Sequence, residues 1–257
     1  MSLTSSRPAS TDVDLTVLDN AAWHALNHAH REFAEGSGAA RRYRPDVSVF
    51  HATPDDEPAS WDELYRATPP EESVVLFRAL PLTPTDDWEL QYSGPGFQLL
   101  FVADRAQPPA LPATDPASGR AVRLRPLIDA DIPAMTALVA LTEPGPFRPR
   151  TIDLGGYVGI FHDDELVAMA GQRLRPPGFC EISAVCTHPS ARRRGYASVV
   201  TLQVAAGIID RGERPFLHLA ASNTAAMAVY ERIGFEVRTE VGFGVYRPLG
   251  ANTDAAA

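Results

Sequence analysis

The hydrophobic positions after residue 120 alternate between strand and helix patterns in a regular order. Apolar runs predict strands over residues 121–127, 157–161, 166–173, 180–186, 216–220, 235–238 and 243–246. Apolar residues at helical spacing predict helices that begin near Asp129, span 196–211 and span 224–233, with Gly212 ending the second. This order predicts a mixed α/β fold for the C-terminal half.

The N-terminal half has a weaker pattern of two helices followed by strands. Asn20 is placed to cap a helix whose apolar stripe reaches Phe33 and ends before Gly36. Ser60 and Glu63 have the spacing of a capping box that opens a second helix. Strands are predicted over 74–79, 89–92 and 98–103. The sequence therefore predicts a smaller α+β domain in front of the larger one.

A proline-rich stretch separates the two halves. Residues 106–119 contain four prolines and little that is apolar enough to pack, which predicts a linker. We therefore expect an N-terminal domain over 1–105, a linker over 106–119 and a second domain over 120–249. The small, polar tail 250–257 is expected to be frayed.

Composition restricts the location and the chemistry of the protein. Hydrophobic residues make up 45% of the 257 positions, enough for a sizeable core. No apolar run approaches the roughly 18 residues of a membrane helix, and residues 1–14 lack the apolar centre of a secretory signal, so we expect a cytoplasmic protein without a membrane partner. All 23 basic residues are arginines, which excludes lysine Schiff-base chemistry and a P-loop lysine.

The charge is unevenly distributed along the chain. The net charge of −9 divides into 8 Arg against 18 acids up to Asp115, net −10, and 15 Arg against 14 acids after it, net +1. The nearly neutral half can accept a polyanionic cofactor, whereas the acidic half disfavours nucleic acid.

No metal site or disulfide is predicted. His24 and His28 have the i, i+4 spacing of metal ligands, but Ala25 stands where a zinc protease carries its glutamate, so a solvated polar face is favoured. His30 is interpreted as a packed ring. Cys180 and Cys186 should lie about 20 Å apart on one extended strand, too far for a mutual disulfide.

The loop before the predicted helix 196–211 has the features of an anion site. It follows an apolar strand, and a loop that opens a helix directs unpaired N–H groups at one point, where the helix dipole also favours negative charge. Gly195 permits a tight turn, and Ala197 is small enough for phosphate oxygens to approach. At least one of the three arginines is interpreted as a solvated basic turn. The candidate binding residues are Arg192, Arg193, Arg194, Gly195, Tyr196, Ala197 and Ser198.

A second motif follows at a fixed distance. Ser222-Asn223-Thr224 ends a strand and starts a helix, which continues into Tyr230-Glu-Arg-Ile-Gly234-Phe235. Together the two stretches resemble the two signature motifs of the GNAT superfamily of N-acetyltransferases, the pyrophosphate loop and the Asn…Tyr-x-x-x-Gly-Phe helix. The resemblance covers about half of the chain. Ala197 departs from the final glycine of the first motif, and the whole chain looks like a bacterial branch with an N-terminal extension.

The resemblance implies a splayed central sheet and a coenzyme site. Acetyl-CoA would bind in a wedge between residues 184–186 (Ala184, Val185 and Cys186) and 219–221. The Val185 N–H would face the thioester oxygen, and Val185 would also pack in the core. Tyr230 would donate a proton to the coenzyme sulfur, because its reference pKa of about 10 is close to the value of about 8.5 for a thiol. Asn223 would bind pantetheine, cap its helix, or do both.

Two further residues keep alternatives open. Glu181 occupies a position where several GNAT members place a general base, and it would act through water; an exposed carboxylate or one bonded to an arginine is an equal alternative. Cys186 lacks an arguable histidine partner, so a small buried thiol is favoured over a nucleophile. His188 is interpreted as part of the loop structure.

The resemblance implies direct transfer of an acetyl group to a primary amine in a ternary complex, without a metal. The alternative is a non-catalytic acyl-CoA sensor or interaction module; a nucleotide-binding protein is disfavoured by the missing lysine. The acceptor is expected to be a small-molecule or peptide amine, held by residues 141–150 and 240–243. Glu143 and Glu240 would suit a cationic amine. The oligomeric state, a homodimer included, is left open.

Overall fold

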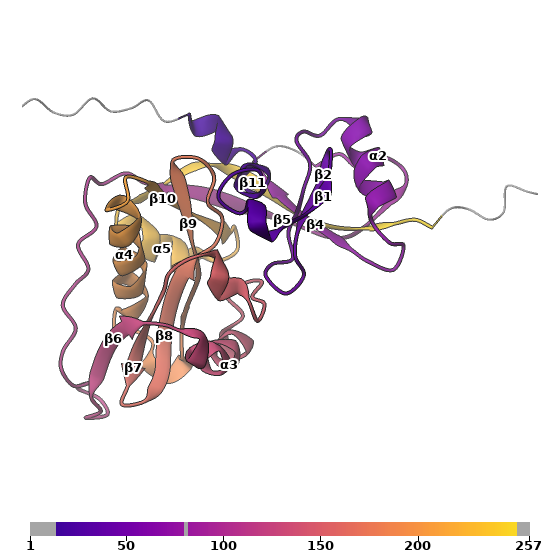
Figure 1. Ribbon diagram of the computed structural model, residues 1–257. Helices are drawn as coiled ribbons and strands as arrows, with labels where there is room; N and C mark the ends of the chain where they lie inside the picture. Colours follow the sequence, from indigo (N-terminus) through magenta and orange to yellow (C-terminus); the bar gives the residue numbers. More distant parts are fainter. Residues whose placement is uncertain (1–13, 80–81, 251–257) are drawn as a thin grey trace, which may run out of the picture.

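One large twisted sheet organises the molecule. The computed structural model describes residues 14–79 and 82–250 (Figure 1). In order across the sheet, the eight strands are β4 (Val74–Arg78), β11 (Phe235–Pro248), β5 (Trp88–Phe101), β10 (Arg214–Ala220), β9 (Phe179–Thr187), β8 (Glu165–Gln172), β7 (Tyr157–His162) and β6 (Val122–Pro126). Among these described strands, β9 and β10 pair in parallel and the other neighbours are antiparallel. The expected mixed sheet is therefore confirmed.

Helices cover both faces of the C-terminal strands. Helix α4 (Tyr196–Ile209) packs along β8 and β9 on one face, and α3 (Ile132–Thr142) packs on the other (Figure 1). Helix α5 (Thr224–Arg232) leads into β11. The predicted helices and strands of this half are confirmed, except that 235–238 and 243–246 belong to one long strand, β11. A bulge between Val237 and Thr239 interrupts its register without ending it.

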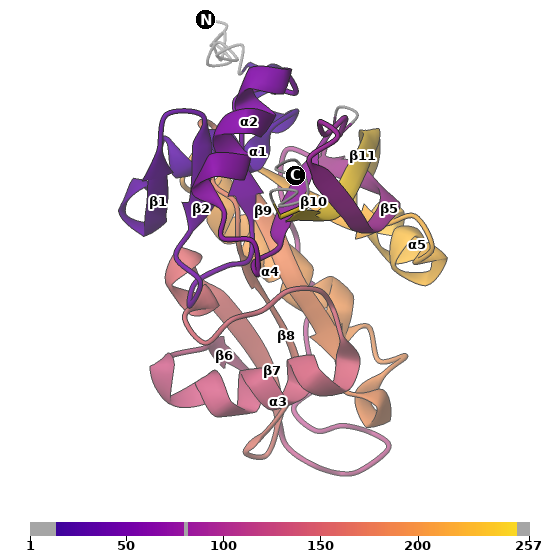
Figure 2. The same ribbon diagram turned by 90° about the vertical axis from the view of Figure 1, so that its right-hand side faces the viewer.

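The N-terminal half adds two helices and a small sheet, which lie above β6, β7 and β8 of the large sheet in Figure 2. The helices are α1 (Ala21–Leu26) and α2 (Pro58–Ala67), and the small sheet contains β1 (Ala34–Ser37), β2 (Ala40–Tyr43) and β3 (His51–Ala52). Short 3-10 turns occupy Leu15–Leu18, Arg31–Phe33, Asp129–Asp131, Thr151–Leu154 and Pro189–Ala191.

The predicted helix starts in this half hold in part. Asn20 is the N-cap residue of α1, as expected, but its side chain forms no capping bond and its amide donates to the Thr53 carbonyl at 2.8 Å. The helix also ends early, at Leu26. Ser60 lies inside the first turn of α2, which begins at Pro58, and its hydroxyl donates to Asp55 at 2.6 Å. Proline suits a first helical position because it has no N–H to satisfy there.

The sheet is continuous across the expected domain boundary. The predicted strands 89–92 and 98–103 form one strand, β5, which lies between β10 and β11. Leu26 and Phe50 from the N-terminal half share one buried cluster with Phe179 and Phe216 from the C-terminal half. The strands expected in a separate N-terminal unit are therefore part of the larger sheet, because its central positions offer pairing on both edges. The division of the chain into domains stays a prediction.

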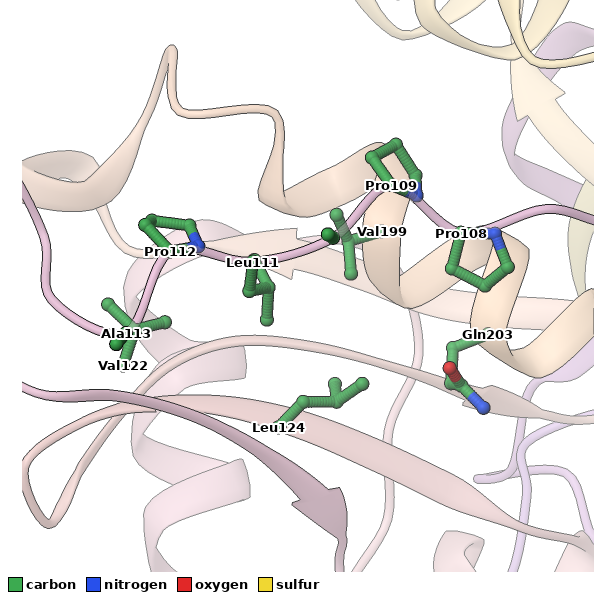
Figure 3. Close-up of a pocket in the computed structure, with 10 residues that line it drawn as sticks. Pro108, Pro109, Leu111, Pro112, Ala113, Val122, Leu124, Val199 and Gln203 are labelled. Atoms are coloured by element: carbon green, nitrogen blue, oxygen red, sulfur yellow. The ribbon is translucent and has the colours of Figure 1, made fainter.

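The proline-rich segment 106–119, called the strap below, packs against the C-terminal half. Leu111 is directed between Val199 of α4 and Leu124 of β6 (Figure 3). Asp115 is 1% exposed and lies in a turn closed by the Arg120 carbonyl. The expectation that this segment has too little apolar surface to pack is corrected, because Ala106 and Leu111 pack against the core cluster that contains α4 and Asp115 is buried. The frayed-tail prediction covers residues 250–257, of which 251–257 lie outside the described residues.

Candidate functional site

Strands β9 and β10 part in the middle of the sheet. Their parallel register ends at the pair Ile182–Leu217, although both strands continue for several residues. Beside this point, the β8–β9 register steps from Gly171–Ser183 to Met169–Cys186, so two residues of β9 oppose one of β8. This β-bulge bends the strand and leaves an opening beside β10.

The bulge also reverses which side chains face which helix. Cys180 and Ile182 pack in the α4 cluster, whereas Ala184 and Cys186 pack in the α3 cluster. Side chains two apart on a regular strand share one face, so an extra residue is needed for this reversal. Ala184 supplies it with a left-handed φ of 52°. Consequently Val185 has no register partner on β8 or β10 in the described chain.

The opening is a cavity of about 670 Å³ between β9, β10 and the starts of α4 and α5. It brings together most of the residues predicted for the site. Lining residues among them are Ala184, Val185, Cys186, Arg192, Arg193, Gly195, Tyr196, Ala197, Ser198, Asn223 and Tyr230. Arg194 and Glu181 do not line it.

The turn before α4 presents a row of main-chain donors. In the described part of the chain, no protein acceptor bonds the amide nitrogens of residues 193–198, and the first bond of the helix runs from Val199 N to Gly195 O at 3.2 Å. Gly195 has φ of 76°, and the space where its Cβ would lie is open. A row of free N–H groups at the start of a 14-residue helix fits a phosphate group.

The arginines of this turn divide into two kinds. Arg192 and Arg193 are exposed, line the cavity and form no ion pair within the described residues. The same three statements hold for Arg232 of α5. Arg194 instead forms a bidentate ion pair with Asp115 of the strap, at 2.6 and 3.2 Å. Arg194 is therefore not the solvated basic group that was the alternative, and its predicted role in binding a cofactor stays a prediction.

Tyr230 and Cys186 are buried beside the cavity. Tyr230 is 8% exposed, its hydroxyl has no hydrogen-bond partner among the described residues, and burial raises its pKa to about 12. Burial also raises the pKa of Cys186 to about 11, so this thiol stays protonated at neutral pH. Both cysteines are free. The Cys186 environment fits the interpretation as a buried thiol.

Asn223 has the capping role that its position allows. Its side-chain oxygen accepts from the Ala226 N–H at 3.1 Å and so satisfies a free amide at the start of α5. The residue is exposed and lines the cavity as well. A role in binding pantetheine stays a prediction.

Glu181 is fully buried and bonded on both oxygens. Arg173 donates at 2.8 and 2.6 Å, the Leu174 N–H at 3.2 Å and His218 at 2.7 Å. Burial alone would raise the pKa of this carboxyl, but Arg173 and His218 favour the charged form and hold the pKa at about 2. A carboxylate with this pKa and no free oxygen does not suit the expected role of general base. The alternative of a carboxylate bonded to an arginine is the one observed.

His218 is held on both ring nitrogens. The Gln98 amide bonds its Nε2 at 2.9 Å, and that amide is oriented by Arg238, which donates to its oxygen, and by the Leu18 carbonyl, which accepts from its nitrogen. Burial lowers the pKa of His218, so the ring is neutral and its Nδ1 proton points to Glu181. A free lone pair for proton transfer is therefore missing.

The sequence prediction missed Arg173 and His218, which both line the cavity. Arg173 and Glu181 flank a Pro-Pro-Gly turn between two antiparallel strands, and this is the signal that could have indicated their pairing. His218 gave no signal, because its partners come from distant parts of the chain.

Neither a metal cluster nor a membrane-spanning helix is found in the part of the chain that the structure describes. Residues 14–79 and 82–250 contain no group of three or more His, Cys, Asp or Glu side chains arranged to hold a metal ion. Within the same ranges, no helix has the length and apolar character needed to cross a membrane.

Comparisons with known proteins agree with this geometry. A family model described as FR47-like protein matches residues 157–243. The chain is similar to the crystal structure of a Novosphingobium aromaticivorans protein assigned as a GNAT-family acetyltransferase, with 32% identity and a TM-score of 0.76 over 90% of this chain and 98% of the other. No curated protein matches the chain.

Two more distant structures share the fold. A GCN5-related N-acetyltransferase from Kribbella flavida has 20% identity and a TM-score of 0.58, covering 90% of this chain and 95% of its own. A GCN5-related N-acetyltransferase-like protein from Streptococcus suis has 15% identity and a TM-score of 0.52, covering 92% and 95%. Given the 32% identical relative, which is matched over almost its whole length, the chain belongs to the GNAT superfamily of acetyltransferases.

Proposed function

We propose that the protein transfers an acetyl group from acetyl-CoA to a primary amine within a ternary complex. The observation that supports this most strongly is the row of free amides at residues 193–198, which ends at the opening between β9 and β10. Acetyl-CoA supplies a thioester, whose acyl group is activated toward an amine. The diphosphate would bind the free amides, with Arg192, Arg193 and Arg232 adding positive charge.

The acyl group would be held at the bulge. Val185 has no register partner on either side. In this proposal its N–H donates to the thioester oxygen and to the negative charge that grows on it. Tyr230 is protonated at neutral pH because burial raises its pKa to about 12, and its hydroxyl would donate to the departing thiolate.

The amine must lose a proton, and Glu181 is not free to take it. Glu143 is the one carboxylate among the described residues that line the cavity. It is exposed at the C-terminal end of α3, in a left-handed conformation with φ of 47°. In this proposal Glu143 attracts the ammonium group and receives its proton through water of the cavity.

Two glycines at opposite ends of α4 provide a matched test. Gly195 and Gly212 have φ of 76° and 77°, and open space surrounds both positions. Replacing either by alanine should lower stability equally, by about 1 kcal/mol, because both take the same strained conformation. Gly195→Ala should also weaken coenzyme A binding about tenfold, as measured by calorimetry, since its Cβ enters the diphosphate space. Equal coenzyme A affinity in the two variants would contradict the proposed site.

Turnover is measured separately by thiol release from acetyl-CoA against a panel of amines. Release that depends on the amine supports the transferase. Saturable coenzyme binding without thiol release, for every amine tested, would favour the alternative of an acyl-CoA sensor.

A further inference from the structure

Arg173 follows β8 directly and places a buried guanidinium against the cavity. The residue is 8% exposed, and its guanidinium carbon lies 5.0 Å from the ring centroid of Phe50. Its Nε and Nη2 donate to the two oxygens of Glu181 at 2.8 and 2.6 Å. This pair uses one edge of the planar guanidinium and fixes the orientation of the group.

The other edge of the guanidinium has no partner. Nη1 donates to no acceptor in the described chain, and the second N–H of Nη2 points to the same side. Arg173 lines the cavity, so this edge is available to a ligand. The Arg173 side chain is 10% exposed, so this edge offers two N–H donors at the wall of the cavity without being enclosed by the protein.

The charged groups around this edge indicate which kind of ligand it can bind. Glu181 balances the charge of Arg173, and the neighbouring His218 is neutral because burial lowers its pKa. Glu143 is the one acid among the described lining residues. A free guanidinium edge matches two oxygens in one plane, which is the geometry of a carboxylate.

We propose that the amine acceptor carries a carboxylate, which binds the free edge of Arg173 while Glu143 attracts the ammonium group. This inference rests on the proposed transferase function and names its substrate class as amino acids. Arg173 is then a specificity-determining residue that contacts the acceptor, and Glu181 is a positioning residue that holds the guanidinium.

The separation of the two acceptor groups can be bounded from the strand. Ile182, whose register partner Gln172 directly precedes Arg173, lies three residues before Val185, which is at most about 10 Å because the bulge at Ala184 shortens the strand. The Arg173 side chain reaches into the cavity, so the distance between the carboxylate and the reacting amine of the acceptor is shorter than this bound. A series of substrates of increasing length measures it. Glycine, β-alanine and 4-aminobutanoate increase the spacing in steps of one methylene group.

The test compares each of these acids with its primary amide and with the amine that lacks the carboxyl group. Wild-type protein should use at least one acid with kcat/KM about 30-fold above that of its amide, because a charge-assisted bidentate pair is lost in the amide. Equal kcat/KM for acid and amide throughout the series would overturn the proposal.

The matched variant is Arg173→Gln/Glu181→Gln, which removes both charges of the buried pair and avoids leaving one of them alone. It should lose the preference for the acid and keep the coenzyme A affinity, because neither residue lies at the turn before α4. Arg173→Lys, a second variant, keeps the charge but lacks the planar fork, so the preference should fall partway. A preference that survives in the double variant would also overturn the proposal.

A binding measurement separates this inference from the transferase function. With coenzyme A bound, the preferred acid should raise the melting temperature of wild-type protein and leave that of the double variant unchanged. This shift without thiol release would support the Arg173 site and contradict the proposed transferase function. Thiol release without a preference for acids would support the transferase function and contradict the Arg173 site.

Discussion

The two ends of the cavity differ in how far their polar groups are hydrogen-bonded by the protein. At the start of α4, the amides of residues 193–198 and the side chains of Arg192 and Arg193 have no protein partner in the described chain. At the other end, Glu181 is bonded on both oxygens and His218 on both ring nitrogens. One edge of Arg173 is the exception at this second end.

The difference indicates which polar groups serve the fold and which serve a ligand. A buried polar group that is fully bonded stabilises one conformation and offers little to a ligand. An exposed group without a partner contributes little to stability and is free to bind. Substitutions at the bonded end should therefore affect unfolding, and those at the open end should affect binding.

Removal of the buried carboxylate should give the largest effect on stability. Glu181→Ala leaves Arg173 charged, buried and without its partner, so the free energy of unfolding should fall by about 3–5 kcal/mol in urea denaturation. Glu143→Ala, at an exposed position on the same cavity, should change it by at most about 0.5 kcal/mol. Similar losses in both variants would contradict the contrast between bonded and open groups.

The same carboxylate should make stability depend on pH in the acid range. The pKa of Glu181 is lowered from an ordinary 4.5 to about 2 in the folded protein, so its stabilisation is present above pH 4.5 and is lost as the pH falls through 2. The stability difference between wild type and Glu181→Gln should therefore shrink between these values. A difference that stays constant from pH 5 to pH 2 would show that Glu181 is not held in its charged form.

The tyrosine pair tests catalysis without a change in packing. Tyr230→Phe removes a hydroxyl that has no partner in the described chain, so stability and coenzyme A affinity should be kept while kcat falls about 100-fold. Tyr157→Phe removes another buried, unbonded hydroxyl that does not line the cavity, and kcat should not change. Unchanged kcat in Tyr230→Phe would refute its role as the acid.

A smaller effect, on coenzyme A affinity, is expected at the ion pair that joins the strap to the turn before α4. Asp115→Asn weakens the ion pair that fixes Arg194, so the amides of residues 193–198 should become less ordered and the Kd for coenzyme A should rise about threefold to tenfold. Asp164→Asn disrupts the exposed pair with Arg123 and should leave this Kd unchanged. Arg194→Asp combined with Asp115→Arg should restore part of the affinity, a result that loss of folding alone does not produce.

The motif-bearing parts of the chain were the ones that could be predicted from sequence. The turn around Gly195 and the cap at Asn223 depend on local backbone geometry, which neighbouring residues determine. The strands and helices after residue 120 follow from their periodicity for the same reason. Local patterns therefore indicated the fold class and the location of the cavity.

Contacts between distant residues could not be predicted in the same way. The role of Glu181 depends on Arg173 and His218, and the orientation of His218 depends on Gln98, 120 positions earlier. The pairing of Asp115 with Arg194 likewise joins a proline-rich segment to a turn 79 positions later. A carboxylate in an apolar strand has the same sequence pattern whether it is a base or a bonded anion, so the local pattern left both readings open.

The central place of β5 has a consequence for biosynthesis. Leu99 pairs with Leu217 of β10 and with Val237 of β11, so both neighbours of β5 leave the ribosome more than a hundred residues after it. Translation at about 5–20 residues per second keeps this apolar strand without its pairing partners for several seconds. The nascent chain therefore exposes two strand edges during that interval, and a chaperone that shields β5 would act before the sheet closes.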